Sequence, residues 1–149
     1  NFLKTKIDKI IEKDIKLKFI GELNKLPPKL QKIIKLSEKK TEKKKILQVN
    51  IAINYGSKIE LISAIKKINK KKIKINKKNI DKNLYSKDLP DPDILIRTGD
   101  TCRLSNFLLW QLSYTEIFFE KKLWPEFKVK DFNNILDKFK NVKRNFGSI

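Results

Sequence analysis

The chain has no histidine, no methionine and one cysteine, Cys102. Because histidine is missing, Ser-His-Asp and Cys-His catalysis are excluded, and so is the commonest metal-binding side chain. Any metal must therefore be held by oxygen atoms, the ligands that Mg²⁺ and Ca²⁺ prefer. A single cysteine also excludes an internal disulfide and suits a reducing compartment.

Long apolar runs are missing too. No stretch approaches the ~20 apolar residues that cross a bilayer. Lysines and an aspartate within residues 4–9 interrupt the first apolar positions, unlike a signal peptide. Hydrophobic residues still make up 40% of the chain, enough for a real core. We therefore expect one globular domain over residues 1–149, cytoplasmic or peripheral at a membrane. Because the chain starts at Asn1 and lacks methionine, we expect it to be part of a longer product.

Arginine is scarce. Of 36 basic residues only Arg97, Arg103 and Arg144 are arginines, and the formal net charge is +19. Lysine spread over nearly every segment, with much isoleucine and asparagine, is what an AT-rich coding sequence produces. The charge is therefore weak support for a nucleic-acid partner. The same bias makes each arginine informative, because lysine would serve wherever only a solvated positive charge is needed.

Apolar periodicity predicts alternating strands and helices. Alternation of apolar residues with lysines over residues 15–19 predicts a strand that ends at Gly21. The other expected elements are strands over 46–53 and 94–96, and helices over 2–12, 28–37, 59–68, 80–84, 104–112 and 131–144. This order favours an α/β fold with a parallel sheet and right-handed crossovers. Gly21, Gly56 and Gly99 each follow an expected strand, so we expect their turns to share the ligand-binding edge of the sheet.

The segment over residues 92–127 carries the strongest chemical signal. Arg97 ends an expected buried strand, and Arg103 and Ser105 follow in one short loop at the start of an expected helix. Guanidinium groups bind phosphate oxygens bidentately, and a hydroxyl with free backbone N–H groups adds donors. From spacing alone, a phosphate site and structural salt bridges are equally good interpretations, and Ser105 by itself is more often a helix cap. The carboxylates that could form such salt bridges are Asp93, Asp100 and Glu116.

The order of rare residues in this segment resembles the C-terminal signature of cis-prenyltransferases, whose best-known members are the undecaprenyl diphosphate synthases. The matching residues are Ile96-Arg97-Thr98-Gly99, the run RLSNFLLWQ over 103–111, Tyr114, Glu116, Phe119 and Leu123-Trp124-Pro125. Less specific matches upstream are Phe19-Ile20-Gly21, Leu26-Pro27 and Asn50-x-Ala52-x-Asn54-Tyr55-Gly56. Together they cover nearly the whole chain.

The resemblance implies a parallel-sheet cis-prenyltransferase fold whose N-terminal part is missing here. It implies a transferase that condenses isopentenyl diphosphate with an allylic diphosphate, such as farnesyl diphosphate, into a long-chain polyprenyl diphosphate, a lipid carrier for cell-wall synthesis. Arg97, Arg103 and Ser105 would bind the diphosphate of isopentenyl diphosphate, and Glu116 would be a ligand of the cofactor Mg²⁺. The resemblance further implies a homodimer, a peripheral membrane contact through the lipid product, and no specific nucleic-acid partner.

Several departures from the family pattern limit what can be carried over. The second glycine after Arg-Thr is Asp100, and the arginine after Asn-Tyr-Gly is Lys58. The arginine of a C-terminal Arg-x-Gly element, which in the family reaches toward a partner's active site, is Asn145. The family's N-terminal Asp-Gly-Asn-Gly-Arg loop, whose aspartate is essential to condensation, has no match. We therefore expect the larger, C-terminal part of such an enzyme, with no catalytic residue of its own and inactive alone.

Two alternatives stay open. One is a non-catalytic supporting subunit of a heteromeric cis-prenyltransferase, which would lack the aspartate loop by nature. The other is a basic nucleic-acid-binding module driven by the lysines, with steeply salt-dependent binding. The second is less favoured, because the aromatic residues fall in apolar runs rather than among the lysines.

Overall fold

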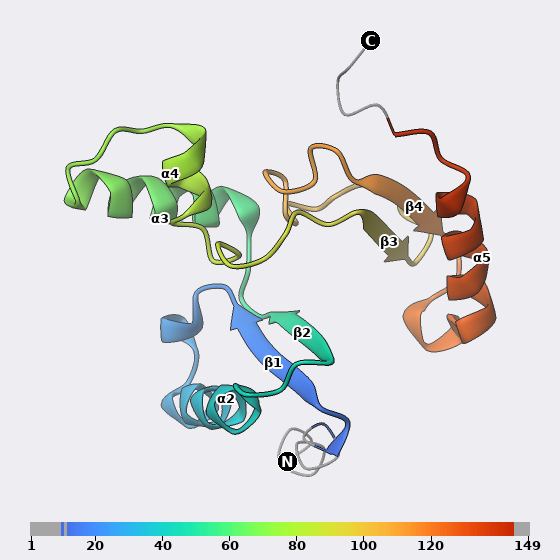
Figure 1. Cartoon of the computed structure of the whole chain (residues 1–149), viewed down its shortest axis with the longest axis horizontal. Coiled ribbons are helices and arrows are strands. Elements are labelled where there is room, and N and C mark those ends of the chain that lie inside the picture. Colours follow the sequence, from blue (N-terminus) through green and yellow to red (C-terminus); the bar gives the residue numbers. More distant parts are fainter. Residues whose placement is uncertain (1–9, 11, 145–149) are drawn as a thin grey trace. The chain divides into compact units, whose positions relative to one another are not determined.

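The computed structural model describes residue 10 and residues 12–144. The chain divides into two compact units, residues 1–88 and 89–149, and each contains one pair of parallel strands (Figure 1). The expected single domain stays a prediction. The expected helix over residues 2–12 lies almost entirely outside the described residues. Within the described residues, every helix is too short or too polar to span a bilayer.

The first unit is built on strands β1 (Ile15–Ile20) and β2 (Leu47–Ala52), which pair in parallel over their whole length. Helix α2 (Pro28–Thr41) lies between them in sequence and packs on β1 (Figure 1). Proline suits the first turn of a helix, where its missing N–H costs no hydrogen bond. The core of this unit is a buried cluster formed by Leu17, Phe19 and Ile34.

The carboxyl ends of β1 and β2 lie at one edge, as expected for parallel strands. Gly21 follows β1 with a φ of 127°, and a Cβ atom on it would lie 2.0 Å from the carbonyl oxygen of Ile53. The backbone N–H of Glu22 donates to the carbonyl of Asn54 at 3.1 Å. The turns that follow the two strands therefore meet, and only glycine permits this close approach. Gly99 belongs to the other unit.

Helices α3 (Ser57–Lys70) and α4 (Lys77–Asp81) complete the first unit. Glu60, in the first turn of α3, is 1% exposed. Its Oε1 accepts backbone hydrogen bonds from Tyr85 at 2.7 Å and Ser86 at 3.3 Å, and its Oε2 accepts one from the Tyr55 hydroxyl at 2.5 Å. This buried carboxylate thus ties the turn before α3 to the residues after α4.

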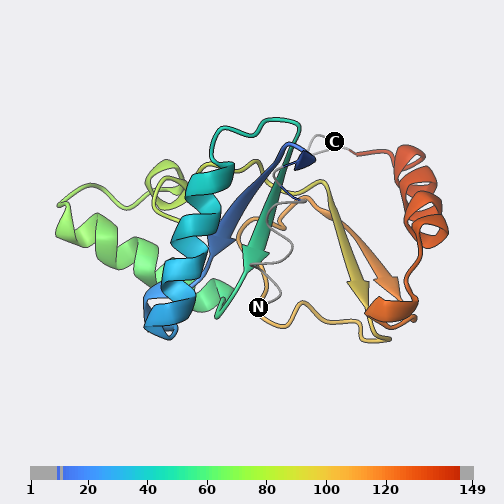
Figure 2. The same cartoon turned by 90° about the horizontal axis from the view of Figure 1, so that it is seen from below.

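The second unit contains strands β3 (Ile94–Thr98) and β4 (Glu116–Glu120), which lie side by side and parallel, and helix α5 (Val129–Lys140) (Figure 2). The part of the chain that the structure describes also has two 3₁₀ helices, η1 (Leu23–Lys25) in the first unit and η2 (Trp124–Glu126) in the second. The α/β class with parallel strands is confirmed. Strand β4 is an element that the sequence analysis missed.

The expected helix over residues 104–112 is wrong. The structure has turns here, without a helix, between β3 and β4. Ser105, Asn106 and Leu108 have φ angles of 48°, 61° and 47°, which belong to the left-handed region. A right-handed α-helix needs φ near −60° at every residue, so three left-handed residues in four positions exclude it. The candidate phosphate loop is therefore an irregular connection and has no helix N-terminus.

Candidate functional site

The guanidinium of Arg97 organises the loop that follows β3. Its Nε donates to the hydroxyl of Thr101 at 2.8 Å, and its Nη1 donates to the hydroxyl of Ser105 at 2.9 Å. Nη1 also donates to the backbone carbonyl of Arg103. Three oxygens from residues 101–105 thus surround one side chain, and the structure brings together all three residues predicted for phosphate binding.

A turn held by the neighbouring strand brings this loop back toward Arg97. Gly99 and Asp100 have φ angles of 96° and 53°. Their N–H groups donate to the carbonyls of Lys122 at 2.9 Å and Glu120 at 3.3 Å, at the end of β4. Asp100 thus occupies a left-handed position at which the resemblance noted in the sequence would place glycine, and aspartate is one of the few other residues that tolerate it.

Arg103 and Ser105 are exposed, whereas Arg97 is half-buried. Among the described residues, the side chain of Arg103 has no salt-bridge or hydrogen-bond partner, and no carboxylate forms a salt bridge with Arg97. Asp93, one carboxylate that could have paired with them, instead binds Arg144 at 2.6 Å. The two arginines therefore present positive charge that no carboxylate in the described part of the chain neutralises.

Glu116 lies away from this loop. It is the first residue of β4 and pairs with Ile94, whereas Arg97 pairs with Phe119, three residues further along. Three residues of strand span about 10 Å, and successive side chains alternate between the two faces. Glu116 therefore belongs to the opposite end and the opposite face of the strand pair. The structure does not bring it to the arginines.

A magnesium ion would find few ligands among the described residues. They contain no group of three or more acidic, histidine or cysteine side chains that could hold a metal. Mg²⁺ commonly binds through only one or two carboxylates, with water and substrate phosphates supplying the other ligands. Glu116 alone thus fits a site shared with substrate, but it does not form a metal site from protein groups only.

Two residues at this end of the chain were not predicted for the site. Thr101 contacts Arg97, but a hydroxyl in a turn-rich loop gives no sequence signal, because its position depends on the fold of the turn. Arg144 donates to Asp93 and, at 3.1 Å, to the carbonyl of Tyr114, which ties a residue four positions beyond α5 to the residues just before β3 and β4. Lys58 lies in α3 of the first unit, and Asn145 lies outside the described residues.

Comparison with known proteins gives matches along nearly the whole chain. Residues 1–147 match the family model described as undecaprenyl diphosphate synthase. The chain is 42% identical to a ditrans,polycis-undecaprenyl-diphosphate synthase ((2E,6E)-farnesyl-diphosphate specific) from Wigglesworthia glossinidia brevipalpis, over 99% of this chain and 59% of that protein. It is also 42% identical to a tritrans,polycis-undecaprenyl-diphosphate synthase (geranylgeranyl-diphosphate specific) from Picrophilus torridus, over 94% of this chain and 58% of that protein.

The fold matches solved structures as well. Lavandulyl diphosphate synthase from Lavandula x intermedia, in complex with dimethylallyl diphosphate, aligns with a TM-score of 0.92 and 31% identity over 99% of this chain and 67% of that one. This match confirms the fold expected from the resemblance. The chain spans about three fifths of the length of the curated relatives it matches.

Proposed function

Because the chain belongs to the undecaprenyl diphosphate synthase family of prenyltransferases, we propose that the complete protein condenses isopentenyl diphosphate with an allylic diphosphate into a long-chain polyprenyl diphosphate. Within this chain, the loop around Arg97 would bind the diphosphate of isopentenyl diphosphate. One observation carries this proposal: two arginines share one loop. Three loop oxygens fix the guanidinium of Arg97, and the side chain of Arg103 has no partner among the described residues.

The chemistry of the reaction explains why such a loop is needed. The allylic carbon–oxygen bond breaks and releases diphosphate, the alkene of isopentenyl diphosphate forms the new carbon–carbon bond, and a proton leaves the neighbouring carbon. The alkene must be held in line with the allylic carbon, which a fixed diphosphate at its other end achieves. Arginine side chains suit this task, because a planar guanidinium binds phosphate oxygens in a defined orientation.

The cofactor and the partners belong to the same proposal. When bound, Mg²⁺ would stabilise the negative charge that develops on the leaving diphosphate, and Glu116 is the residue of this chain proposed to help hold it. The two relatives named above have the same identity to this chain but different allylic substrates, so only the class of allylic diphosphate is proposed. The homodimer and the peripheral membrane contact stay predictions.

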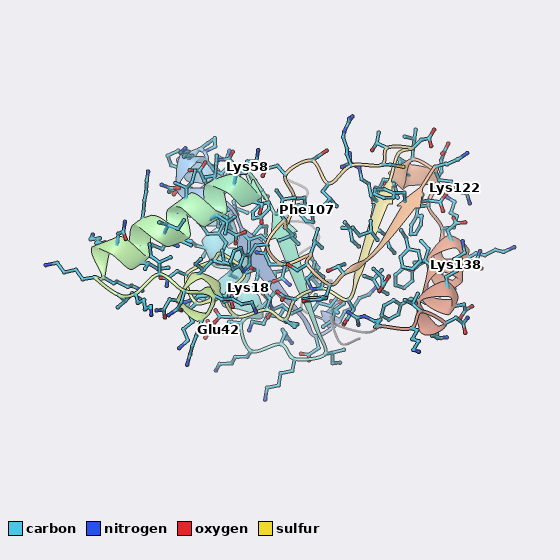
Figure 3. The ribbon with its side chains drawn as sticks, turned by 90° about the horizontal axis from the view of Figure 1, so that it is seen from above. Lys18, Glu42, Lys58, Phe107, Lys122 and Lys138 are labelled. Carbon is cyan, nitrogen blue, oxygen red and sulfur yellow. The ribbon has the colours of Figure 1, made fainter. Side chains whose placement is uncertain are left out.

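Binding of isopentenyl diphosphate to the chain, measured by isothermal titration calorimetry, tests the site. We expect Arg103→Gln to weaken binding by about ten- to a hundred-fold, because a hydrogen bond to a charged group contributes about 1.5–3 kcal/mol. The matched control is Lys138→Gln, which removes the same charge from an exposed position on α5 (Figure 3). An equal loss in both variants would show unspecific attraction to a basic protein and would refute the assignment.

A further inference from the structure

We propose that Thr101 is a positioning residue of the diphosphate site, whose hydroxyl sets the orientation of the Arg97 guanidinium. This inference rests on the proposed function of the same loop. Its observation is the hydrogen bond of 2.8 Å from Nε of Arg97 to Oγ1 of Thr101, in a half-buried position. Neither the sequence pattern nor the family resemblance pointed to this residue.

The hydrogen bonds of Arg97 leave one nitrogen of its guanidinium, Nη2, for a ligand. A guanidinium has five N–H donors in one plane. Nε uses its single donor on Thr101, and Nη1 donates to Arg103 and Ser105. Among the described residues, Nη2 has no hydrogen-bond partner. Its two donors are therefore available to phosphate oxygens.

Thr101 is needed for this arrangement because both other hydrogen bonds are made at one nitrogen, Nη1. Held at Nη1 alone, the guanidinium could still pivot about that nitrogen. The hydrogen bond at Nε holds the group at a second nitrogen and so sets the direction of Nη2. A side chain held in its binding orientation before the ligand arrives loses less entropy on binding, which raises affinity.

The backbone supplies the position of the Thr101 hydroxyl. Gly99 and Asp100, both in the left-handed region, reverse the chain between Arg97 and Thr101. Two hydrogen bonds from this turn to the residues at the end of β4 hold it in place. The orientation of Arg97 thus depends on the sheet through the turn and the hydroxyl.

The test compares two substitutions at one position by titration calorimetry with inorganic diphosphate and with isopentenyl diphosphate. Thr101→Val keeps the shape of the side chain and removes its hydroxyl, whereas Thr101→Ser keeps the hydroxyl. We expect Thr101→Val to weaken binding of both ligands by about three- to tenfold and Thr101→Ser to stay within about twofold. Ser113→Ala removes an exposed hydroxyl that donates to Trp110 outside this cluster and should leave binding unchanged.

Thermal unfolding of each variant separates a positioning role from a merely structural one. The inference requires that Thr101→Val lowers affinity while the unfolding midpoint stays near that of the parent chain. Wild-type affinity in Thr101→Val overturns it, and so does a parallel loss of affinity and stability that Thr101→Ser fails to rescue. If both Thr101→Val and Arg103→Gln bind diphosphate with wild-type affinity, the diphosphate site itself is wrong. If Arg103→Gln binds weakly and Thr101→Val binds normally, the site stands and the role of Thr101 is wrong.

Discussion

Removing the negative charge of Asp100 should tighten diphosphate binding. Asp100 lies in the turn between Arg97 and Arg103, where its carboxylate opposes any anion bound by the two arginines. Asparagine also tolerates the left-handed φ of 53° seen at this position. Asp100→Asn therefore changes the charge and leaves the turn intact. We expect a lower dissociation constant for inorganic diphosphate.

The size of the effect follows from the position of Asp100 in the chain. Asp100 is three positions from each arginine in the sequence, which places its Cα within ~11 Å of either one. At ~10 Å in water two unit charges interact by ~0.4 kcal/mol, so about two to three ligand charges give ~1 kcal/mol, roughly a fivefold change in the dissociation constant. At 0.15 M salt, where the Debye length is ~8 Å, the gain should shrink to about twofold.

Titration calorimetry at about 10 mM and about 150 mM salt, roughly fifteenfold apart in ionic strength, measures this effect. Asp91→Asn is the matched control, since Asp91 is exposed, carries the same charge and lies ahead of β3, six residues before Arg97. Asp100→Gly adds a second comparison. Glycine relieves about 1–2 kcal/mol of left-handed strain in the folded chain. It also lowers the free energy of unfolding by about 0.4–1 kcal/mol, because glycine has more conformational entropy in the unfolded chain, so the net change in stability should be small. Equal affinities for Asp100→Asn and the parent chain at low salt would refute an anion site at this loop.

Two further predictions concern stability. Gly21→Ala should lower the free energy of unfolding by at least about 3 kcal/mol. The new Cβ would lie 2.0 Å from the carbonyl oxygen of Ile53, in a backbone conformation that L-residues rarely adopt. A loss below about 1 kcal/mol in urea denaturation would contradict the close approach. Acid should weaken the attachment of α5, since a hydrogen bond from Lys122 holds the pKa of Asp131 below its ordinary value. This stabilisation is complete above the pKa of the unfolded carboxyl and is lost as pH falls through the lower folded pKa. Asp131→Asn should therefore flatten the acid side of the stability profile, and an unchanged profile would show that the pair contributes nothing.

Periodicity predicted most elements because tertiary contacts agree with it. β1 alternates apolar residues with lysines, and the structure buries Leu17 and Phe19 accordingly. The failure at residues 104–112 has a local cause: an apolar run can be read as a helix, but Ser105 and Asn106 are turn formers and both take left-handed angles. β4 was missed because its apolar stretch is only three residues, Ile117–Phe119 between two glutamates, so its identity as a strand depends on pairing with β3.

The same distinction separates the predictable from the unpredictable part of the site. Arg97, Arg103 and Ser105 come together because they are close in sequence and a glycine turn joins them. Glu116 is eleven residues beyond Ser105, and its position depends on the register between β3 and β4, which pairs it with Ile94. A shift of one residue would have moved it to the other face. Register is a property of the folded sheet, which a single sequence does not reveal at this distance.

The chain has lysine at nearly every basic position. The hydrogen-bond geometry of its three arginines explains why these positions do not carry lysine as well. Arg97 uses Nε and Nη1 on three oxygens, and Arg144 uses Nη1 and Nη2 on Asp93 and Tyr114. A single ammonium group at the end of a flexible stem cannot reach acceptors on two edges of a plane at once. The fork geometry of both side chains is therefore used within the protein.

Arg103 has the same geometry but no partner for it among the described residues. An exposed guanidinium beside a fixed one needs an external ligand to use its parallel donors, and a diphosphate offers the matching oxygens. Arg103→Lys, which keeps the charge, should therefore weaken diphosphate binding measurably, whereas a site that needs only positive charge would bind as well as before.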